Sequence, residues 1–381
     1  MSLYAQDGVN LSEEDDFSSY AARVCALTYR NSPYVRVLDF SQGNFRGPRP
    51  FVLRGLPRGF CLDNGPDGIG TKTIVKVAAS SCYTAGIDLL AMCAGDITRW
   101  GGLPLVFTNI LDLAALAKKG ERANNAARDM ILGLKDAACE IGVVLHKGET
   151  AELGVCVGSE IEDAFIKFNW AGNMLGVYNP RNMINGSTLR PGMVLVALRE
   201  PAGFRSNGFS AVREAFRRRF GETWWRNVEA EEYVAMAAAP SVIYDKFLAY
   251  MNGWHSRGFR PPVKLHLIVH VTGGAIESKL ARDILFPLKL SADLTDLWPP
   301  SLIMRKCASW RGLSDRECYR VWNGGQGVIA ALEEHNVPRF ISYAKRFNIQ
   351  AKVCGPPIRK SRHPRVIIHS KFRGKRIVIE P

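Results

Sequence analysis

The sequence predicts an α/β protein built from two domains. Its 381 residues are more than one ordinary hydrophobic core organises. Three times along the chain, at residues 51–79, 192–220 and 265–285, an apolar segment leads through a glycine-containing turn into a segment with helical spacing. A cluster of Asn, Gly, Ser and Pro over residues 179–191 is typical of a connection. We therefore expect one domain over residues 1–185 and a second over residues 186–381.

The stretch 62–72 is the most informative part of the first half. It contains three glycines that we expect to form a turn with backbone N–H groups open to a ligand: Gly65, Gly68 and Gly70. Successive N–H groups bind anions, and Lys72 adds a charge suited to phosphate. Asp67 would repel a bare phosphate, so it suggests a bridging Mg²⁺. A Gly–Asp turn between two strands, with no ligand, explains the same residues.

The other elements of the first half alternate between helices and strands. Helices are expected over residues 18–29, 84–95 and 123–142. Strands are expected over residues 51–53, in the segment before Asp67, and over residues 103–111, 143–145 and 168–177. Asp96 then lies near a helix end, and Glu149 follows a strand. If the strands share a sheet, Asp67, Asp96 and Glu149 converge at one edge and hold Mg²⁺ between nucleotide phosphates. The alternative for Asp96 is an ordinary capping or turn carboxylate.

The second half repeats the step from strand through turn to helix. The polar loop 203–210 leads into a helix over residues 211–220, so its Ser and Asn could bind an anion at the helix N-terminus or serve as an ordinary cap. Residues 265–271 form a second strand that ends at a Thr-Gly-Gly turn. His270, taken alone, is interpreted as a structural histidine. Trp224 and Trp225 are expected to pack inside the domain.

The charge distribution has two interpretations. The chain carries a formal net charge of +14, and residues 359–376 hold eight cations without an acidic residue. A solvated basic edge is one reading, and a nucleic-acid surface is the other. No zinc finger or RNP aromatic signature accompanies these cations, so a nucleic-acid partner is not favoured.

Composition and cysteine spacing favour a cytoplasmic location. No run of about 18 apolar residues predicts a membrane helix, so no membrane partner is expected. The first residues lack the basic and apolar regions of a signal peptide. The nine cysteines form no Cys-x-x-Cys pair, which indicates free thiols in a reducing compartment.

Six motifs occur in an order and spacing that resemble one family, the aminoimidazole ribonucleotide synthetases, or phosphoribosylformylglycinamidine cyclo-ligases, of purine biosynthesis. The motifs lie at residues 67–72, 86–93, 148–152, 206–210, 270–274 and 323–327. Each is weak by itself, but six together cover nearly the whole chain.

The resemblance implies a two-domain ATP-binding synthetase fold. Its N-terminal domain contributes to a barrel-like dimer interface, so a homodimer is expected, and its C-terminal domain is α/β. It also implies ATP, Mg²⁺ and a phosphorylated ribonucleotide substrate. In the family reaction ATP phosphorylates the formamide oxygen of formylglycinamidine ribonucleotide. The amidine nitrogen then closes the imidazole ring and releases phosphate, a reaction that depends on positioning and charge stabilisation.

The resemblance assigns roles to individual residues. The catalytic residues are Lys72, Asn207 and His270. The residues that contact the nucleotide are Gly65, Asp67, Gly68, Gly70, Thr71, Lys72, Asp88 and Glu149. The metal ligands are Asp67, Asp96 and Glu149. The residues at the substrate phosphate are Arg205, Ser206, Asn207, Gly208, Thr272, Gly273 and Gly274.

Several positions depart from the family pattern. Cys82 and Arg205 stand where the family has histidines, and residues 43–47 keep part of its glycine-rich nucleotide loop. Arg205 is expected to strengthen phosphate binding while removing a proton-transfer group, or else to be a surface arginine. Two alternatives to ring closure follow. The chain could be a related synthetase that acts on another acceptor, or a non-catalytic homologue associated with nucleotides or nucleic acid.

Overall fold

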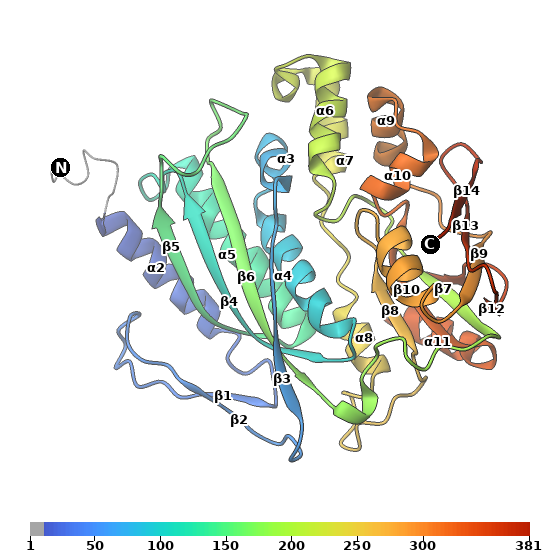
Figure 1. Cartoon of the computed structure of the whole chain (residues 1–381). Coiled ribbons are helices and arrows are strands. Elements are labelled where there is room, and N and C mark those ends of the chain that lie inside the picture. The colour runs from blue at the N-terminus through green and yellow to red at the C-terminus, as the bar shows by residue number, and fades with distance from the viewer. Residues whose placement is uncertain (1–10) are drawn as a thin grey trace. The chain divides into compact units, whose positions relative to one another are not determined.

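The computed structural model describes residues 11–381 and divides into two compact units (Figure 1). The first unit runs to Ile97 and resumes from Leu103 to Pro180, and the second comprises Thr98–Gly102 and Arg181–Pro381. Both mix helices with sheets, which confirms the predicted α/β class. Within the described range no helix has both the length and the apolar character needed to cross a membrane. The residues examined for a signal peptide lie mostly outside that range.

The first unit is a four-stranded sheet with helices packed on it. Its elements are α2 (Leu11–Ala26), β1 (Val35–Val37), β2 (Phe51–Leu53), β3 (Cys61–Gly68), α3 (Lys72–Ala78), α4 (Tyr83–Thr98), β4 (Leu103–Leu113), α5 (Arg122–Ile141), β5 (Val144–Glu152) and β6 (Phe168–Tyr178). The sheet has the order β3-β6-β4-β5, with β4 and β5 parallel and the other neighbours antiparallel. Strands β1 and β2 form a separate hairpin-like pair.

Helices α4 and α5 approach each other closely through two glycines. A Cβ at Gly133 would lie 1.8 Å from the carbonyl oxygen of Tyr83, and one at Gly86 would lie 2.3 Å from the backbone nitrogen of Leu134. Any side chain at either position would separate the helices. Helix α5 ends at Gly142, whose φ of +81° is the left-handed cap expected for a glycine after a helix.

The second unit contains two four-stranded sheets and several helices. Its regular helices and strands are β7 (Met193–Arg199), α6 (Phe209–Phe220), α7 (Glu231–Ala237), α8 (Asp245–Met251), β8 (Leu267–His270), the π-helix η4 (Ile276–Leu285), β9 (Leu290–Leu294), α9 (Leu302–Arg311), α10 (Asp315–Val321), β10 (Gln326–Glu333), α11 (Val337–Arg346), β11 (Ala351–Val353), β12 (Arg359–Lys360), β13 (Val366–His369) and β14 (Arg376–Ile379). Short 3₁₀ turns occupy Pro180–Asn182, Trp224–Arg226, Val228–Ala230 and Glu334–Asn336.

The two sheets of this unit share a hydrophobic cluster. Their strand orders are β11-β7-β10-β8 and β12-β9-β13-β14. The cluster takes side chains from both sheets and from η4, including Leu195, Leu294 and Leu280. Trp224 is fully buried and packs 5.2 Å from Phe216, centroid to centroid, as expected for a packing residue.

Candidate functional site

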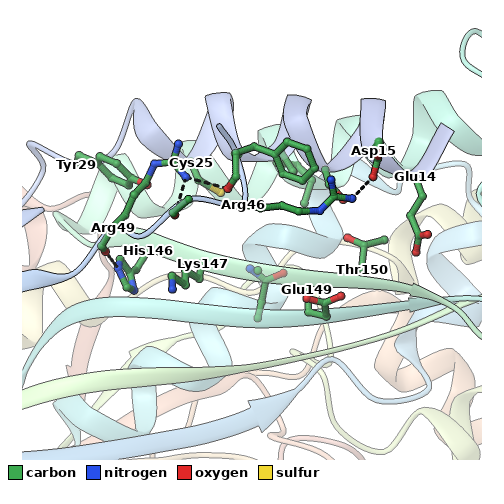
Figure 2. A pocket seen from close by; sticks show the side chains of 18 residues that line it. Glu14, Asp15, Cys25, Tyr29, Arg46, Arg49, His146, Lys147, Glu149 and Thr150 are labelled. Carbon is green, nitrogen blue, oxygen red and sulfur yellow. Dashed lines mark hydrogen bonds and ion pairs between the residues drawn. The ribbon is translucent and has the colours of Figure 1, made fainter. Parts of the chain in front are cut away.

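A pocket of about 430 Å³ lies in the first unit between α2, the loop before β2, and strand β5 (Figure 2). Cationic and acidic groups both line it. The cationic side chains are Arg46, Arg49 and Lys147, and the carboxylates are Glu14, Asp15 and Glu149. A pocket with both kinds of charge suits a ligand that carries phosphate together with a divalent cation.

The loop over this pocket is held in place by Arg49. Its guanidinium donates hydrogen bonds to the carbonyl oxygens of Phe45 (2.8 Å) and Asn44 (2.9 Å) and to the Ser41 hydroxyl (2.8 Å). His146 on β5 contacts the Arg49 carbonyl oxygen through Nε2, which ties the loop to the sheet. Burial lowers the pKa of His146, so the neutral imidazole is favoured there. The partial glycine loop predicted at residues 43–47 therefore borders a fixed pocket.

Negative charge is concentrated near the N-terminal end of α2. Burial raises the pKa of Glu14, and the neighbouring carboxylates of Glu152, Asp15 and Glu149 raise it further. The repulsion that raises the pKa of Glu14 is relieved when a cation binds between these carboxylates. This end of the pocket therefore fits Mg²⁺ better than it fits an anion.

The three predicted metal ligands do not converge. Strand pairing places Asp67 in one row with Gly172, Asn109 and Gly148, so three strand spacings, about 14 Å, separate β3 from β5. Glu149 belongs to the next row, and successive side chains of a strand project from opposite faces of the sheet. Among the described residues, no three His, Cys, Asp or Glu side chains lie close enough to share a metal ion.

Asp67 and Asp96 lie near each other, apart from Glu149. Both carboxylates contribute to raising the pKa of Cys93, behind the larger effect of burial. A Cβ at Gly65 would lie 3.1 Å from the Cβ of Asp96, so this glycine lets α4 approach β3. Helix α4 extends to Thr98, which places Asp96 in its last turn.

The predicted glycine turn is mostly a strand. Gly65 and Gly68 belong to β3, and only residues 69–71 separate that strand from α3. Of the three glycines, Gly70 alone has a positive φ, at +62°. Thr71 precedes the first residue of α3 without capping it through its side chain. The expectation of an extended anion-binding turn was therefore wrong, and a short turn at Gly70 remains.

Lys72 and Asp88 form a buried ion cluster with Lys76. Both lysine Nζ atoms lie 2.8 Å from carboxylate oxygens of Asp88, and all three side chains have 0% exposure. Burial would raise the pKa of Asp88, but the two lysines outweigh it and hold the pKa below its ordinary value. Lys72 points into the unit rather than toward a surface loop, so Asp88, and not a surface ligand, balances its charge here.

In the second unit, two predicted loops meet at one place. The loop that contains Ser206 and Asn207 precedes α6, and the turn Thr272–Gly274 follows β8. A Cβ at Gly208 would lie 2.7 Å, and one at Gly273 2.5 Å, from the same carbonyl oxygen of Val321. The end of α10 therefore brings the two loops together, and glycine is required on both sides of it.

Buried polar atoms that have no hydrogen-bond partner among residues 11–381 surround this meeting point. They are the hydroxyl oxygen of Ser206, the amide nitrogen of Asn207 and Nε2 of His270. Buried polar groups are normally paired, so three such atoms in adjoining loops indicate where a polar ligand binds. Burial, with help from Arg205, Lys279 and Arg99, holds the pKa of His270 well below its ordinary value. His270 is therefore neutral near pH 7.

Arg205 occupies neither of its predicted positions. Its side chain is 2% exposed, and Nη1 lies 3.3 Å from both the Glu200 carboxylate and the Val242 carbonyl oxygen. Tyr244 donates a hydrogen bond of 3.1 Å to the same carboxylate. The buried Glu200 thus holds the guanidinium inside the unit. Arg205 is therefore neither a direct phosphate ligand nor a surface arginine.

Sequence reasoning missed several residues at the two sites. In the first unit it omitted the pocket cations Arg46, Arg49 and Lys147, and in the second it omitted Lys279, whose Nζ donates to the Thr272 hydroxyl at 3.3 Å. Arg46 and Arg49 lie in or beside the glycine-containing stretch 43–47, and this pattern could have indicated an anion site. Lys279 gave no comparable signal, because only the fold of η4 brings it back to Thr272. Cys82, which replaces a family histidine, is buried, and burial raises its pKa to about 11.

Known proteins resemble this chain in sequence over most of its length. Residues 60–166 match the family model described as AIR synthase related protein, N-terminal domain. A phosphoribosylformylglycinamidine cyclo-ligase of Streptococcus sanguinis is 30% identical over 88% of this chain and 91% of its own length. One from Thermodesulfovibrio yellowstonii is 28% identical over 92% of this chain and 95% of its own.

Solved structures agree in fold. Thiamine-monophosphate kinase from Stenotrophomonas maltophilia superposes with a TM-score of 0.58 at 14% identity, covering 91% of this chain and 94% of that one. Hydrogenase maturation protein HypE in complex with ATP superposes with a TM-score of 0.57 at 13% identity, covering 90% of each chain. Fold likeness and sequence identity over most of the length lead to one conclusion. The chain belongs to the phosphoribosylformylglycinamidine cyclo-ligase family.

Proposed function

We propose that this protein uses ATP to close the ring of formylglycinamidine ribonucleotide and form 5-aminoimidazole ribonucleotide, a step of purine biosynthesis. The observation that carries the proposal is the 30% identity to a named cyclo-ligase over 88% of the chain. The pocket of the first unit and the joined loops of the second supply the two polar sites that such a reaction needs.

The nucleotide is assigned to the pocket of the first unit. Arg46 and Lys147 would contact its phosphates, and the carboxylate-rich end with Glu14 and Glu149 would hold Mg²⁺. When bound, Mg²⁺ neutralises phosphate charge and supports phosphoryl transfer. We assign Asp67, Asp96 and the turn at Gly70 to a second group of nucleotide contacts. A bound nucleotide would have to extend from the pocket to this group.

The phosphorylated substrate is assigned to the joined loops of the second unit. The backbone of Gly208 and Gly273 and the buried polar groups of Ser206 and Asn207 would offer donors to a phosphate, whereas the Gly274 nitrogen already donates to the Tyr319 carbonyl oxygen at 3.3 Å. Lys279 adds a positive charge through its contact with Thr272. These groups orient the substrate, and Arg205 supports them from beneath through Glu200 rather than by direct contact.

The chemistry depends on activation of the formyl oxygen and on one proton transfer. Transfer of the γ-phosphoryl group from ATP to that oxygen releases ADP. Attack by the amidine nitrogen then forms the new C–N bond, and the C–O bond breaks to release phosphate. The nitrogen must lose a proton as the ring closes. We assign this proton to Nε2 of His270, which has no hydrogen-bond partner among the described residues.

The proposal is tested by incubating the purified chain with Mg-ATP and formylglycinamidine ribonucleotide. The expected result is stoichiometric release of ADP, phosphate and the aminoimidazole product, identified by mass spectrometry. If ADP forms only when another acceptor is supplied, or if no acceptor supports ADP release, this assignment is wrong.

Glu149→Gln is expected to weaken Mg-ATP binding by about tenfold, because one charged neighbour of the cation is lost. Calorimetry with Mg²⁺ and a non-hydrolysable ATP analogue measures this effect. Glu140→Gln, on the exposed side of α5, is the matched control and is expected to bind normally. If the two variants bind Mg²⁺ and the ATP analogue with equal affinity, Glu149 does not contribute to the metal site.

We also infer a homodimer that forms through the open face of the first unit's sheet. Leu62 on β3 and Ile110 on β4 are 49% and 52% exposed, although both lie within strands. Exposed apolar side chains on a sheet mark a face that a partner covers. Light scattering should therefore give twice the chain mass of 42.2 kDa.

Ile110→Lys is expected to shift the protein toward monomer, because it places a charge in the centre of this face. Val155→Lys, at a fully exposed position outside the strands, is the control and should leave the mass unchanged. A monomeric unmodified chain at micromolar concentration would contradict the inference.

A further inference from the structure

The segment 359–365 carries a concentration of positive charge that the proposed reaction does not use. Its four exposed Arg and Lys side chains form no ion pair within the described part of the chain: Arg359, Lys360, Arg362 and Arg365. Cations nearby in the sequence behave differently. Lys352 pairs with Asp296 at 2.5 Å and Arg373 with Asp315 at 3.5 Å. Lys375 and Arg376 are also exposed and form no ion pair among the described residues, so the segment 359–365 is the larger of two groups of unpaired cations in this part of the unit.

The segment borders a hollow of about 770 Å³ at one end of the sheet β12-β9-β13-β14. Arg359 is paired with Ser291 on β9, and the Arg365 backbone nitrogen donates to the Ser291 hydroxyl at 3.0 Å. Glu380, which directly follows β14, is the acidic side chain among the described residues of the lining. Positive charge thus extends from β12 across β9 to the start of β13 and outweighs the single carboxylate.

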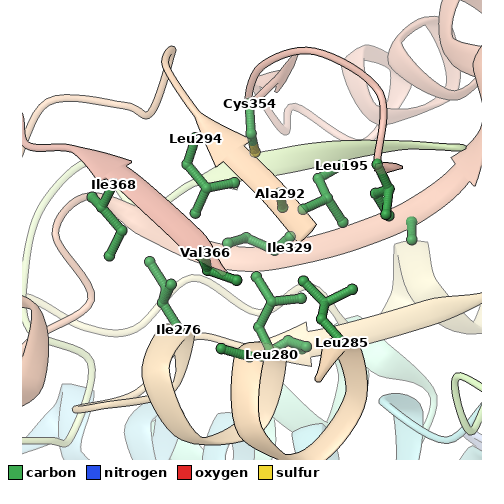
Figure 3. Packing of buried hydrophobic residues seen from close by; sticks show 14 of the residues in the cluster. Leu195, Ile276, Leu280, Leu285, Ala292, Leu294, Ile329, Cys354, Val366 and Ile368 are labelled. Atoms are coloured by element: carbon green, nitrogen blue, oxygen red, sulfur yellow. The ribbon is translucent and has the colours of Figure 1, made fainter. Parts of the chain in front are cut away.

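The backbone beneath these cations is ordered by hydrogen bonds and by packing. The Ser361 nitrogen donates to the Lys289 carbonyl oxygen at 2.9 Å, and its hydroxyl donates to the His363 carbonyl oxygen at 2.8 Å. Figure 3 shows Val366 and Ile368, which directly follow the segment, packed within the hydrophobic cluster of the unit. The cations therefore project from a fixed platform, which lowers the entropy lost when a ligand binds.

The chemistry of the lining selects a ligand by charge. Its ring-bearing side chains are His363 and two prolines, so a base has no large aromatic face on which to stack. It also presents no long apolar side chain that could enter a lipid bilayer. Two strand spacings separate Arg359 from Arg365, about 10 Å. That distance is about three times the 3.4 Å axial spacing of phosphates along one strand of a duplex, so the segment spans more than one phosphate.

We propose that the hollow bordered by residues 359–365 binds the phosphodiester backbone of a nucleic acid without regard to base sequence. Arg359, Arg362 and Arg365 provide the phosphate contacts, and Glu380 limits how far a phosphate enters. The proposal is independent of ring closure, because none of these residues belongs to the nucleotide pocket or to the substrate loops.

The test uses the full chain and fluorescein-labelled single-stranded RNA of about 20 nucleotides, in two unrelated sequences. Fluorescence anisotropy is recorded from about 50 to 200 mM salt. The test variant is R359Q/R362Q/R365Q. The matched control is R257Q/K264Q/R305Q, which removes the same charge from three exposed positions of the same unit. Thermal unfolding of both variants checks that they are folded.

The unmodified chain is expected to bind both RNAs with similar affinity. The test variant should bind about tenfold more weakly or worse, with a salt slope smaller by about two, because three phosphate contacts are lost. The control should stay within about twofold of the unmodified chain.

Equal weakening in both variants would show that net charge, and not this hollow, carries the binding. Absence of RNA binding by the unmodified chain also overturns the proposal. So does a result in which the test variant loses binding only to inorganic tripolyphosphate or to phosphatidylserine vesicles. Loss of ring closure has no bearing on the outcome, since the readout is anisotropy.

Discussion

Asp88→Asn is expected to lower the free energy of unfolding of the first unit by about 3–5 kcal/mol. The carboxylate lies between Lys72 and Lys76, with no exposure on any of the three side chains. Removing it leaves two buried lysines without the group that balances them, and an uncompensated buried charge is among the most costly single changes. Urea unfolding followed by circular dichroism measures the loss, without any nucleotide present.

Asp136→Asn is the control for this measurement. Asp136 lies on α5, is about half exposed, and pairs with Lys135 and with the hydroxyl of Tyr83 on α4. Exposed pairs contribute about 0–1 kcal/mol, so this variant should unfold near the unmodified chain. If Asp88→Asn behaves in the same way and instead loses ATP affinity, the ion cluster belongs to the nucleotide site and the structural role given to Lys72 is wrong.

Acidification from pH 7 to pH 5 is expected to lower the free energy of unfolding through His270, by at most about 2 kcal/mol. The folded-state pKa of His270 lies well below the value of about 6.5 that it regains on unfolding. Below pH 6.5 the unfolded chain therefore binds a proton that the folded chain does not. The contribution of His270 to the free energy of unfolding is fully present above about pH 6.5. It decreases as the pH falls, until the folded-state pKa is reached.

Two other histidines also lower the free energy of unfolding as the pH falls. The pKa values of His146 and His266 are also lowered, in each case mainly by burial. His270→Gln should therefore remove part of the pH dependence and leave the remainder. His363→Gln, at an exposed position, is the control and should leave the profile unchanged. A His270→Gln profile identical to that of the unmodified chain would show that His270 is accessible to protons in the folded state.

Local sequence patterns predicted the elements better than the contacts between them. The helix that ends at Gly142 and the loop before α6 could be identified because capping and apolar spacing are local properties. A strand was expected in the segment before Asp67, and β3 confirms it, but the glycine-rich part of β3 was read as a turn because glycine and aspartate disfavour strands. Gly65 lets α4 approach β3 closely, since a Cβ there would lie 3.0 Å from the Cys93 carbonyl oxygen and 3.1 Å from the Cβ of Asp96.

Several predicted site residues lie apart in the structure because their positions also depend on long-range contacts. Whether Asp67 and Glu149 share an edge depends on strand order and on register, and a shift of one residue moves a side chain to the other face. The inward position of Arg205 depends on Glu200, a buried partner that no motif marks. In contrast, Ser206, Asn207 and the Thr272–Gly274 turn were predicted as ligand groups from their places beside helices, and the structure brings those loops together.

Strand β12 also affects how this protein behaves among other copies of itself. It is the outermost strand of its sheet and consists of Arg359 and Lys360 alone. An outer strand offers unpaired backbone groups on which a neighbouring chain could add a further strand, the first event in many forms of aggregation. Here the strand is too short to act as a template, and each of its residues brings a charge that repels the same strand of another molecule. Positive charge at this position therefore also protects the solubility of the protein, whatever else it binds.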